Sequence, residues 1–314
     1  MKHDITSLKD FLSRKIKALA VFPALAIWLI CGASATAWAA DGFAPLLTIK
    51  EFRALPQNEV VLLDTRSTWR YLLGHIPGAQ PTGDWQDYSV RRDGVPGFID
   101  QDTATIARKL KAMGVDREKT LVLYGDPEDK WRTDGRFFWM LEFYGFTRTA
   151  LLEGGVDSWE NQGLPLERGP APSPAASNLK AQDIQFNWDV YADQKWIADR
   201  LHSPNLALID NREQNEYNGA TPYGSSRGGH IPGAVHIDWR EFYDARGRLK
   251  PLDTLESLLA KWKITKDKEV VVYCTGGVRS GMAYFVFRCL GYNVRNYDGS
   301  WWDWSRNPQL PVES

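Results

Sequence analysis

One stretch of the chain combines a cysteine with residues that could make it reactive. Residues 270–273 form an apolar, mostly β-branched run that ends at Cys274, and four residues separate this cysteine from Arg279. The pattern predicts a buried strand, a short loop around the sulfur, and a helix that begins near Ser280. Backbone N–H groups in such a loop, together with the positive end of the helix, would stabilise a thiolate at neutral pH. Cys274 is therefore the predicted nucleophile, and the alternative is an inert, buried cysteine.

The residues around this cysteine favour the reactive interpretation. Gly276 and Gly277 permit left-handed backbone angles and a close approach of N–H groups to an anion. Arg279 supplies a fixed positive charge for the sulfur or for an oxyanion bound beside it. The loop that we expect to stabilise a sulfur anion consists of Thr275, Gly276, Gly277, Val278, Arg279 and Ser280.

Three further residues have side chains that could belong to the same site. Cys289 lies nine residues beyond Ser280 in an apolar segment of helical length, about 13 Å along a helix, so we expect core packing and no disulfide with Cys274. Arg212 and Arg227 are candidates for contact with a substrate anion, and Arg227 lies in a nine-residue insertion within 218–228. The alternative for each arginine is a salt bridge with a neighbouring carboxylate.

The two halves of the chain repeat each other. Four segments of the first half return in the same order about 150 residues later, as Asp-x-Arg after an apolar run, Gly-His-Ile-Pro-Gly-Ala, a second apolar run ending in Tyr, and Gly followed by Trp. The chain is therefore a tandem duplication. The first copy has no cysteine after its second apolar run, and its loop is about three residues longer. We expect this copy to help wall the cleft and Asp126 and Glu128 to be solvated loop charges. His75 and His230 are expected to satisfy backbone groups of the repeated turns, and the alternative is a catalytic His230.

Each copy alternates helices with short apolar strands. In the first copy we expect a capped helix from Thr48, strands at 60–64, 121–124 and 150–152, and helices at 103–113 and 135–144. In the second copy we expect helices near 190–201 and 253–262 before the strand, loop and helix around Cys274. This alternation predicts an α/β fold with two tandem domains, each a mainly parallel sheet flanked by helices, with ligands at the carboxyl ends of the strands. The expected domains are 45–168 and 184–314, joined by a proline- and alanine-rich linker at 169–183.

The composition and the N-terminal residues indicate which partners and which cellular location to expect. The chain has 314 residues and a net charge of -1, which gives no reason to expect nucleic acid as a partner. Residues 1–40 combine a basic start, an apolar tract and Ala-Trp-Ala-Ala, and this order predicts a secretory signal peptide. We therefore expect a periplasmic protein without membrane attachment after cleavage. The alternative is an uncleaved membrane anchor.

These features together resemble the tandem-domain rhodaneses, the thiosulfate and 3-mercaptopyruvate sulfurtransferases. The resemblance covers residues 45–314 and depends on the two Asp-x-Arg segments, the two His-Ile-Pro-Gly-Ala turns, the loop from Cys274 to Arg279, and the closing Asp-Gly-Ser-Trp segment at 298–301. It implies an inactive N-terminal domain and a C-terminal domain whose Cys274 carries a persulfide. It also implies a small-molecule sulfur donor, a thiophilic acceptor such as cyanide, a thiol or a periplasmic protein, and no metal or organic cofactor.

The same resemblance indicates which substrates are favoured and which are disfavoured. Mercaptopyruvate enzymes use an arginine at the position of Glu216 for the substrate carboxylate, so the resemblance disfavours mercaptopyruvate and favours thiosulfate or a persulfide donor. Phosphatases and arsenate reductases place five residues between cysteine and arginine, whereas four intervene here, so a phosphoryl group should fit poorly. A non-catalytic periplasmic sulfur carrier stays open, because a carrier and an enzyme share the same loop.

Overall fold

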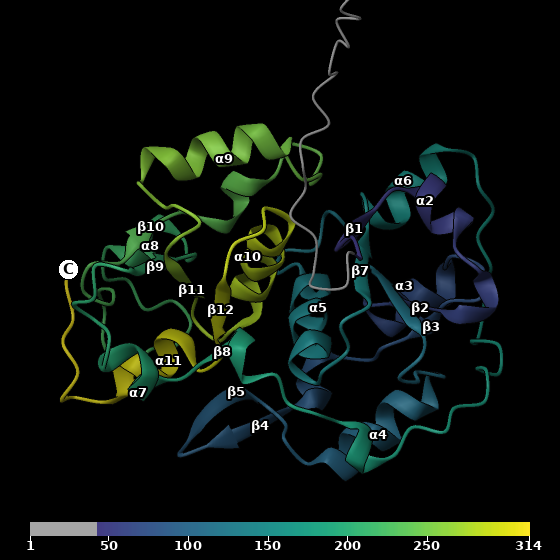
Figure 1. The fold of residues 1–314 in the computed structure, drawn as a ribbon, viewed down its shortest axis with the longest axis horizontal. Coiled ribbons are helices and arrows are strands. Elements are labelled where there is room, and N and C mark those ends of the chain that lie inside the picture. Colours follow the sequence, from purple (N-terminus) through teal and green to yellow (C-terminus); the bar gives the residue numbers. More distant parts are fainter. Residues whose placement is uncertain (1–42) are drawn as a thin grey trace, which may run out of the picture. The chain divides into compact units, whose positions relative to one another are not determined.

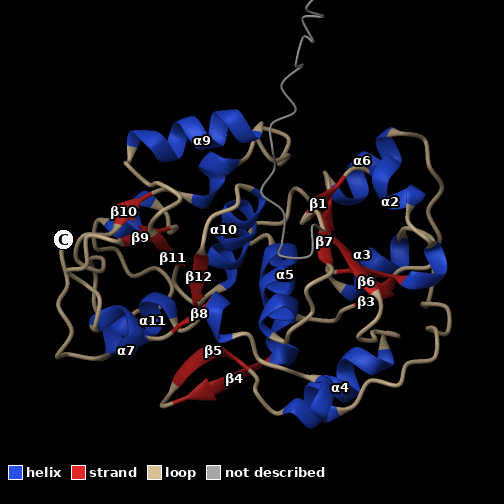
Figure 2. Cartoon of the chain, in the orientation of Figure 1, coloured by secondary structure: helices blue, strands red, loops and turns tan. Residues whose placement is uncertain are grey.

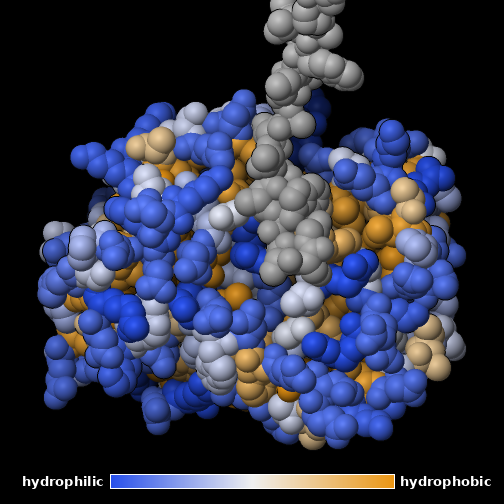
Figure 3. Space-filling model, in the orientation of Figure 1, coloured by the Kyte–Doolittle hydropathy of each residue, from blue (hydrophilic) through white to orange (hydrophobic). Residues whose placement is uncertain are grey.

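The computed structural model describes residues 43–314, which belong to one compact unit (Figure 1). The predicted signal peptide at 1–40 lies outside the described residues. Within them, no helix is long and apolar enough to cross a membrane. In the face shown in Figure 3, hydrophilic side chains predominate and hydrophobic ones occur in scattered patches.

The first half forms a parallel sheet of five strands in the order β1-β7-β6-β2-β3. Its strands are β1 (Leu46–Leu47), β2 (Val60–Asp64), β3 (Gln80–Pro81), β6 (Thr120–Tyr124) and β7 (Thr149–Leu152). Its helices are α2 (Ile49–Ala54), α3 (Thr68–Leu73), α4 (Thr103–Ala112), α5 (Thr133–Phe143) and α6 (Gly155–Asn161). The strand predicted at 60–64 has the predicted bounds, and Thr48 and Glu51 form the predicted capping box at the start of α2.

The second half repeats this topology, with the order β8-β12-β11-β9-β10. Its strands are β8 (Tyr191–Ala192), β9 (Leu206–Asp210), β10 (Val235–His236), β11 (Glu269–Tyr273) and β12 (Val294–Tyr297). Its helices are α7 (Gln194–Ala198), α8 (Gln214–Tyr217), α9 (Leu252–Lys261), α10 (Val278–Cys289) and α11 (Ser300–Arg306). Each strand pairs as its counterpart does in the first half, and this identity of strand order confirms the α/β fold with two parallel sheets.

Most predicted helices differ from the observed ones by a few residues at an end, and two of these differences have a local cause. The helix expected near 190–201 is shortened to α7, because Tyr191 and Ala192 pair with β12 as an edge strand and the Asp193 side chain caps the helix. The helix expected near Ser280 begins two residues earlier, at Val278. Gly277 there has a φ of 79°, a left-handed conformation that ends the loop and allows the helix to start at once.

Helices α5 and α10 join the two halves through their glycines, and Figure 2 shows them side by side between the sheets. A Cβ atom at Gly135 would lie 2.3 Å from the Met282 Cα, and one at Gly281 would lie 2.8 Å from the Arg136 Cα. These glycines occupy matching places in the two copies. The helices therefore pack backbone to backbone, and one buried apolar cluster extends across both halves.

Two further segments complete the fold. The antiparallel hairpin β4 (Ser89–Arg92) and β5 (Val95–Ile99) leaves the first half and contacts α11 of the second. The proline-rich segment that follows α6 lies along the first half, where the Ser177 hydroxyl donates to the Val115 carbonyl at 2.6 Å and Gln80 donates to the Pro172 carbonyl at 3.0 Å.

Candidate active site

Cys274 lies directly after β11, at the carboxyl end of the sheet, where it is 1% exposed. The start of α11 holds the cysteine and the next residue. The backbone N–H of Cys274 donates to the Ser300 hydroxyl at 3.2 Å, and the Trp301 and Trp302 N–H groups donate to the carbonyls of Cys274 and Thr275 at 3.0 and 2.9 Å. The loop is therefore fixed on both sides of the sulfur before any substrate binds.

The surroundings of the sulfur favour its ionised form. Burial alone would raise the pKa of Cys274, but the positive charge of Arg279 and hydrogen bonds from the N–H groups of Ser280 and Gly276 lower it below the ordinary thiol value. The Ser280 hydroxyl also approaches the sulfur, at 3.6 Å. A buried thiolate with N–H donors and a guanidinium beside it is a nucleophile with a place for the charge of a sulfur anion.

Glu216 of α8 holds the arginine of this loop. Its carboxylate accepts two hydrogen bonds from the Arg279 guanidinium, at 2.7 and 3.0 Å, and one from the Thr275 hydroxyl. Arg279 also donates to the Thr275 hydroxyl at 2.6 Å. Burial would raise the pKa of Glu216, but the hydrogen bonds and charge of Arg279 lower it. The guanidinium is thus both fixed in place and partly neutralised.

Two aromatic rings cover the other side of this guanidinium. The Trp131 ring of the first half and the Tyr223 ring of the second lie 5.4 and 5.5 Å from Arg279 and pack edge to face against each other. The Nζ atom of Lys130 lies 4.4 Å from the centre of the Trp131 ring. No pattern in the sequence singles out these residues, although Tyr223 belongs to the insertion within 218–228.

Both halves line the cavity above Cys274, which has a volume of about 700 Å³. The first half contributes two arginines, a lysine and several carboxylates to the wall, which supports the expectation that the copy without a cysteine helps wall the cleft. The lining includes Arg66, Arg70, Asp126, Lys130, Trp131, Tyr223 and Trp302, together with Cys274, Thr275, Gly276, Val278 and Arg279.

Arg136 of α5 supports the loop from the first half. Its buried guanidinium donates to the Asp298 carboxylate at 2.6 Å, to the Gly97 carbonyl at 3.0 Å and to the Gly277 carbonyl at 3.3 Å. The second oxygen of Asp298 accepts from the Ile99 N–H at 2.7 Å. A signal for Arg136 existed in the sequence, because an arginine directly before the apolar run of residues 137–141 in a predicted helix needs a buried partner.

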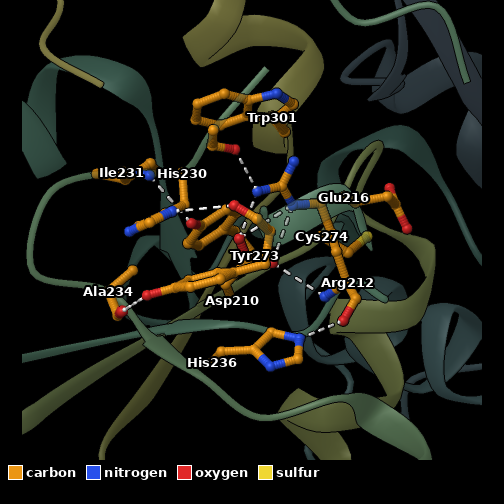
Figure 4. A network of polar contacts seen from close by, with 12 residues as sticks. Asp210, Arg212, Glu216, His230, Ile231, Ala234, His236, Tyr273, Cys274 and Trp301 are labelled. Carbon is orange, nitrogen blue, oxygen red and sulfur yellow. Dashed lines mark hydrogen bonds and ion pairs between the residues drawn. The ribbon is translucent and has the colours of Figure 1, made fainter. Parts of the chain in front are cut away.

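Arg212 is placed outside the cavity lining. It is buried, its guanidinium binds the Asp210 carboxylate with the closest contact at 2.6 Å, and it donates to the Gly229 carbonyl at 2.7 Å. Figure 4 shows its side chain between Asp210 and Trp301. In the first half Arg66 makes the same contacts, with Asp64 and with the Gly74 carbonyl. Because the half without a cysteine has the same ion pair, the contact does not depend on the sulfur site. This favours the alternative that Arg212 forms a structural salt bridge and does not bind substrate.

Arg227 is also absent from the cavity lining. Its guanidinium donates to four backbone carbonyls at and beyond the end of α11, those of Trp304, Ser305, Asn307 and Leu310. This positive charge at the negative end of a helix anchors the insertion on α11. Arg227 therefore positions the segment that brings Tyr223 to the cavity.

The remaining candidates lie where packing explains them. Cys289 is buried and its pKa is raised by that burial, and both cysteines of the described residues are free. The Nδ1 atoms of His75 and His230 lie 2.9 and 3.1 Å from the Tyr71 and Tyr217 carbonyl oxygens. Among residues 43–314, no group of three or more His, Cys, Asp or Glu could hold a metal ion.

One expectation about the first copy was wrong. Asp126 is not a solvated loop charge, because its side chain is buried and forms an ion pair with Arg70. It also accepts a hydrogen bond from the Glu128 N–H at 2.8 Å. Glu128 itself is exposed, as expected.

Known proteins resemble this chain over most of its length. A family model described as a rhodanese-like domain matches residues 48–162 and 193–307. A thiosulfate sulfurtransferase of Azotobacter vinelandii is 34% identical over 263 residues, which cover 82% of this chain and 93% of that protein. A 3-mercaptopyruvate sulfurtransferase of Escherichia coli (strain K12) is 30% identical, with coverage of 80% and 87%.

A protein named as a sulfur carrier and a solved crystal structure also resemble this chain. The sulfur carrier protein TtuD of Thermus thermophilus is 34% identical and covers 83% of this chain and 90% of its own length. The crystal structure of SseA from Escherichia coli, described as a 3-mercaptopyruvate sulfotransferase, matches with a TM-score of 0.69 and 27% identity, over 82% of this chain and 99% of that one.

Proposed function

The chain belongs to the family of rhodanese-like domains, and from that premise we propose that it is a sulfurtransferase that forms a persulfide on Cys274. The donor is thiosulfate or a related persulfide, and the acceptor is a thiophile such as cyanide or a thiol. The observation that carries this proposal is the buried Cys274, whose pKa is lowered by Arg279 and by loop N–H groups at the edge of a cavity.

The first step loads the cysteine. The Cys274 thiolate attacks the outer sulfur of thiosulfate, the bond between the two sulfurs of the donor breaks, and its electron pair leaves with sulfite. The product is a Cys274 persulfide whose negative charge lies beside the N–H groups of Ser280 and Gly276 and near Arg279.

The second step unloads it. A cyanide ion or thiolate attacks the outer sulfur of the persulfide, and the bond to the Cys274 sulfur breaks with its electron pair on that sulfur. The cysteine thus returns as a thiolate. Because the cysteine carries the sulfur throughout, the cycle requires no metal and no organic cofactor.

Two other functions of the family have weaker support. Relatives of this chain are named 3-mercaptopyruvate sulfurtransferase, but the buried Glu216 occupies the position where we expect those enzymes to have an arginine for the substrate carboxylate. Another relative is named a sulfur carrier, and a carrier would form the same persulfide but pass it only to a protein partner.

Mass spectrometry of the intact protein separates these functions. Incubation with thiosulfate should add one sulfur atom to the protein and release sulfite, whereas mercaptopyruvate should release little pyruvate. The adduct should be absent from Cys274→Ser and present in Cys289→Ser. An adduct on another residue, or p-nitrophenyl phosphate turnover without sulfur transfer, would contradict the proposal. Turnover with cyanide distinguishes an enzyme from a carrier that only accepts sulfur.

We also propose that the protein acts in the periplasm after removal of residues 1–40. The basic start, apolar tract and Ala-rich end of this segment support the proposal. N-terminal sequencing of the protein from a periplasmic extract should find a start near Asp41. An intact Met1 in the membrane fraction would instead indicate an uncleaved anchor.

A further inference from the structure

A second, smaller cleft adjoins the cavity above Cys274. It has a volume of about 210 Å³ and shares Tyr223 and Trp302 with the larger cavity. Its walls come from both halves of the chain, namely from the β4–β5 hairpin, from the insertion that carries Tyr223, and from the last turn of α11. The function proposed above assigns nothing to this cleft.

Two arginines of this cleft converge on a single oxygen atom. The Nη1 atoms of Arg91 and Arg306 lie 2.7 and 3.4 Å from the carbonyl oxygen of Gly94. Within residues 43–314, neither guanidinium has a carboxylate at ion-pair distance. Two positive charges held at one acceptor repel each other, so an anion that binds both relieves the repulsion and gains two charged hydrogen bonds.

The arginines of the larger cavity differ in this respect. Each already has a carboxylate partner, as Arg66 has Asp64, Arg70 has Asp126 and Arg279 has Glu216. Among the described residues that line the two cavities, the arginines without an acidic partner therefore lie in the smaller cleft, and Lys130 of the larger cavity is the lysine that also lacks an ion pair. In addition, a cavity of about 700 Å³ is of the size that holds an organic ligand, and thiosulfate or cyanide would fill little of it.

We propose that the smaller cleft binds a carboxylate of an organic thiol that accepts sulfur from Cys274, and glutathione serves as the probe thiol that carries such a carboxylate. The inference rests on the sulfur transfer proposed above. The acceptor thiolate attacks the outer sulfur of the Cys274 persulfide, the sulfur–sulfur bond to Cys274 breaks, and the acceptor leaves as its own persulfide. No oxidant or reductant is needed, because one persulfide replaces another.

Trp302 gives the acceptor a surface that leads from one pocket to the other. Its ring lies against the cysteine loop, since a Cβ at Gly276 would be 2.3 Å from the ring, and its indole N–H donates to the Tyr223 carbonyl at 2.9 Å. Trp302 and Tyr223 line both pockets. A flexible thiol that follows this surface can therefore place its sulfur at Cys274 and its carboxylate between Arg91 and Arg306.

A pair of acceptors that differ in one charge tests the proposal. With thiosulfate as donor, kcat/KM is measured for glutathione and for glutathione ethyl ester, whose glycine carboxylate is blocked. The free acid should be preferred about five- to tenfold at low salt, and the preference should weaken at high salt. In Arg91→Ala/Arg306→Ala the preference should fall to about one, and Arg91→Lys/Arg306→Lys should keep part of it.

A matched control removes two positive charges elsewhere. Arg108→Ala/Lys111→Ala on the exposed face of α4 should keep the wild-type preference. The proposal is overturned if the wild type shows no preference for the free acid, or if the cleft variant loses activity equally with both acceptors. Turnover of thiosulfate with cyanide is followed in parallel, and its absence in the wild type would contradict sulfur transfer itself.

A binding measurement keeps the two proposals separate. In Cys274→Ser, which cannot react, glutathione should change the tryptophan fluorescence through Trp302. Adding Arg91→Ala/Arg306→Ala should weaken this binding about five- to tenfold. Binding without any sulfur transfer would retain the subsite and reject the function, whereas transfer to cyanide without glutathione binding would reject the subsite alone.

Discussion

The two strand-to-helix loops of the duplication share one backbone plan but have opposite charges. After β6 the chain continues as Gly125-Asp126, and after β11 as Cys274-Thr275. Arg70 of α3 pairs with the first loop through Asp126, whereas Glu216 of α8 pairs with the second through Thr275 and Arg279. Arg70 and Glu216 occupy matching positions, because each precedes a tyrosine that stacks on the histidine of the repeated turn.

The difference extends to the position of the nucleophile itself. A Cβ on Gly125 would lie 2.9 Å from the Asp134 side chain, and the matching neighbour of Cys274 is Ser280, whose hydroxyl lies 3.6 Å from the sulfur. A thiolate in the first loop would meet a carboxylate, whereas in the second it meets a hydroxyl and N–H groups. The duplication thus kept a scaffold in both halves and a sulfur site in one.

Among the changes that test the difference between the two loops, the removal of Arg279 should have the largest effect. In Arg279→Met, kcat/KM for thiosulfate should fall about 100- to 1000-fold, because the persulfide and the leaving sulfite lose a fixed positive charge. The pKa of Cys274 should rise, since burial then acts with less opposition. Iodoacetamide labelling against pH in a Cys289→Ser background measures that pKa, and an unchanged midpoint would show that the loop N–H groups suffice.

Breaking the buried ion pair between Arg136 of the first half and Asp298 of the second should have the next largest effect. Arg136→Met gives α5 the residue that α10 has at the matching position, Met282. It leaves the buried Asp298 carboxylate without its cation, so the free energy of unfolding should fall by about 3–5 kcal/mol. Urea unfolding measures the change. A loss below about 1 kcal/mol would mean that the other contacts between the halves hold Asp298 without help.

Glu216→Gln should have an intermediate effect that depends on pH. The pKa of Glu216 is lowered in the folded protein, so its charge stabilises the fold above the unfolded-state pKa of about 4.3, and this contribution is lost as the pH falls through the lowered value. At pH 7 the variant should lose about 1–3 kcal/mol, and the difference from wild type should shrink in acid.

The matched change in the first half is Asp126→Asn. Its arginine partner, Arg70, has a side chain that is 42% exposed, so this variant should lose less than about 1 kcal/mol. Thermal unfolding of both variants from pH 3 to 7 compares them. Equal losses of stability in Glu216→Gln and Asp126→Asn would mean that the ion pairs of the two loops contribute equally to folding.

The smallest effect should come from adding a cysteine to the inert loop. Gly125→Cys in a Cys274→Ser background should gain no sulfur adduct with thiosulfate, because Asp134 crowds the new side chain and raises the pKa of its thiol. Intact mass after incubation with thiosulfate checks this. A sulfur adduct at position 125 would show that a cysteine in this loop is sufficient.

The sequence predicted the scaffold and the place of Cys274 in it better than the charges around that cysteine. Periodicity and the internal repeat predicted both sheets, and the loop composition predicted a reactive Cys274. Arg212 and Arg227 were interpreted from their charge alone, and the partners that position them, Asp210 and the carbonyls at the end of α11, are set by tertiary contacts. Glu216 is 59 residues from Thr275, so no local pattern could predict their hydrogen bond.

The pairing of Arg136 with Asp298 also has a consequence for the newly made chain. Asp298 follows Arg136 by 162 residues, so in a chain that is made or exported from its N-terminus there is an interval in which Arg136 has emerged and its partner has not. Throughout that interval the first half carries a guanidinium destined for burial and a glycine-lined helix face without its partner. The N-terminal half can therefore complete its packing only when nearly the whole chain exists. A nascent chain that stalls before β12 should be open to proteases and a client for chaperones.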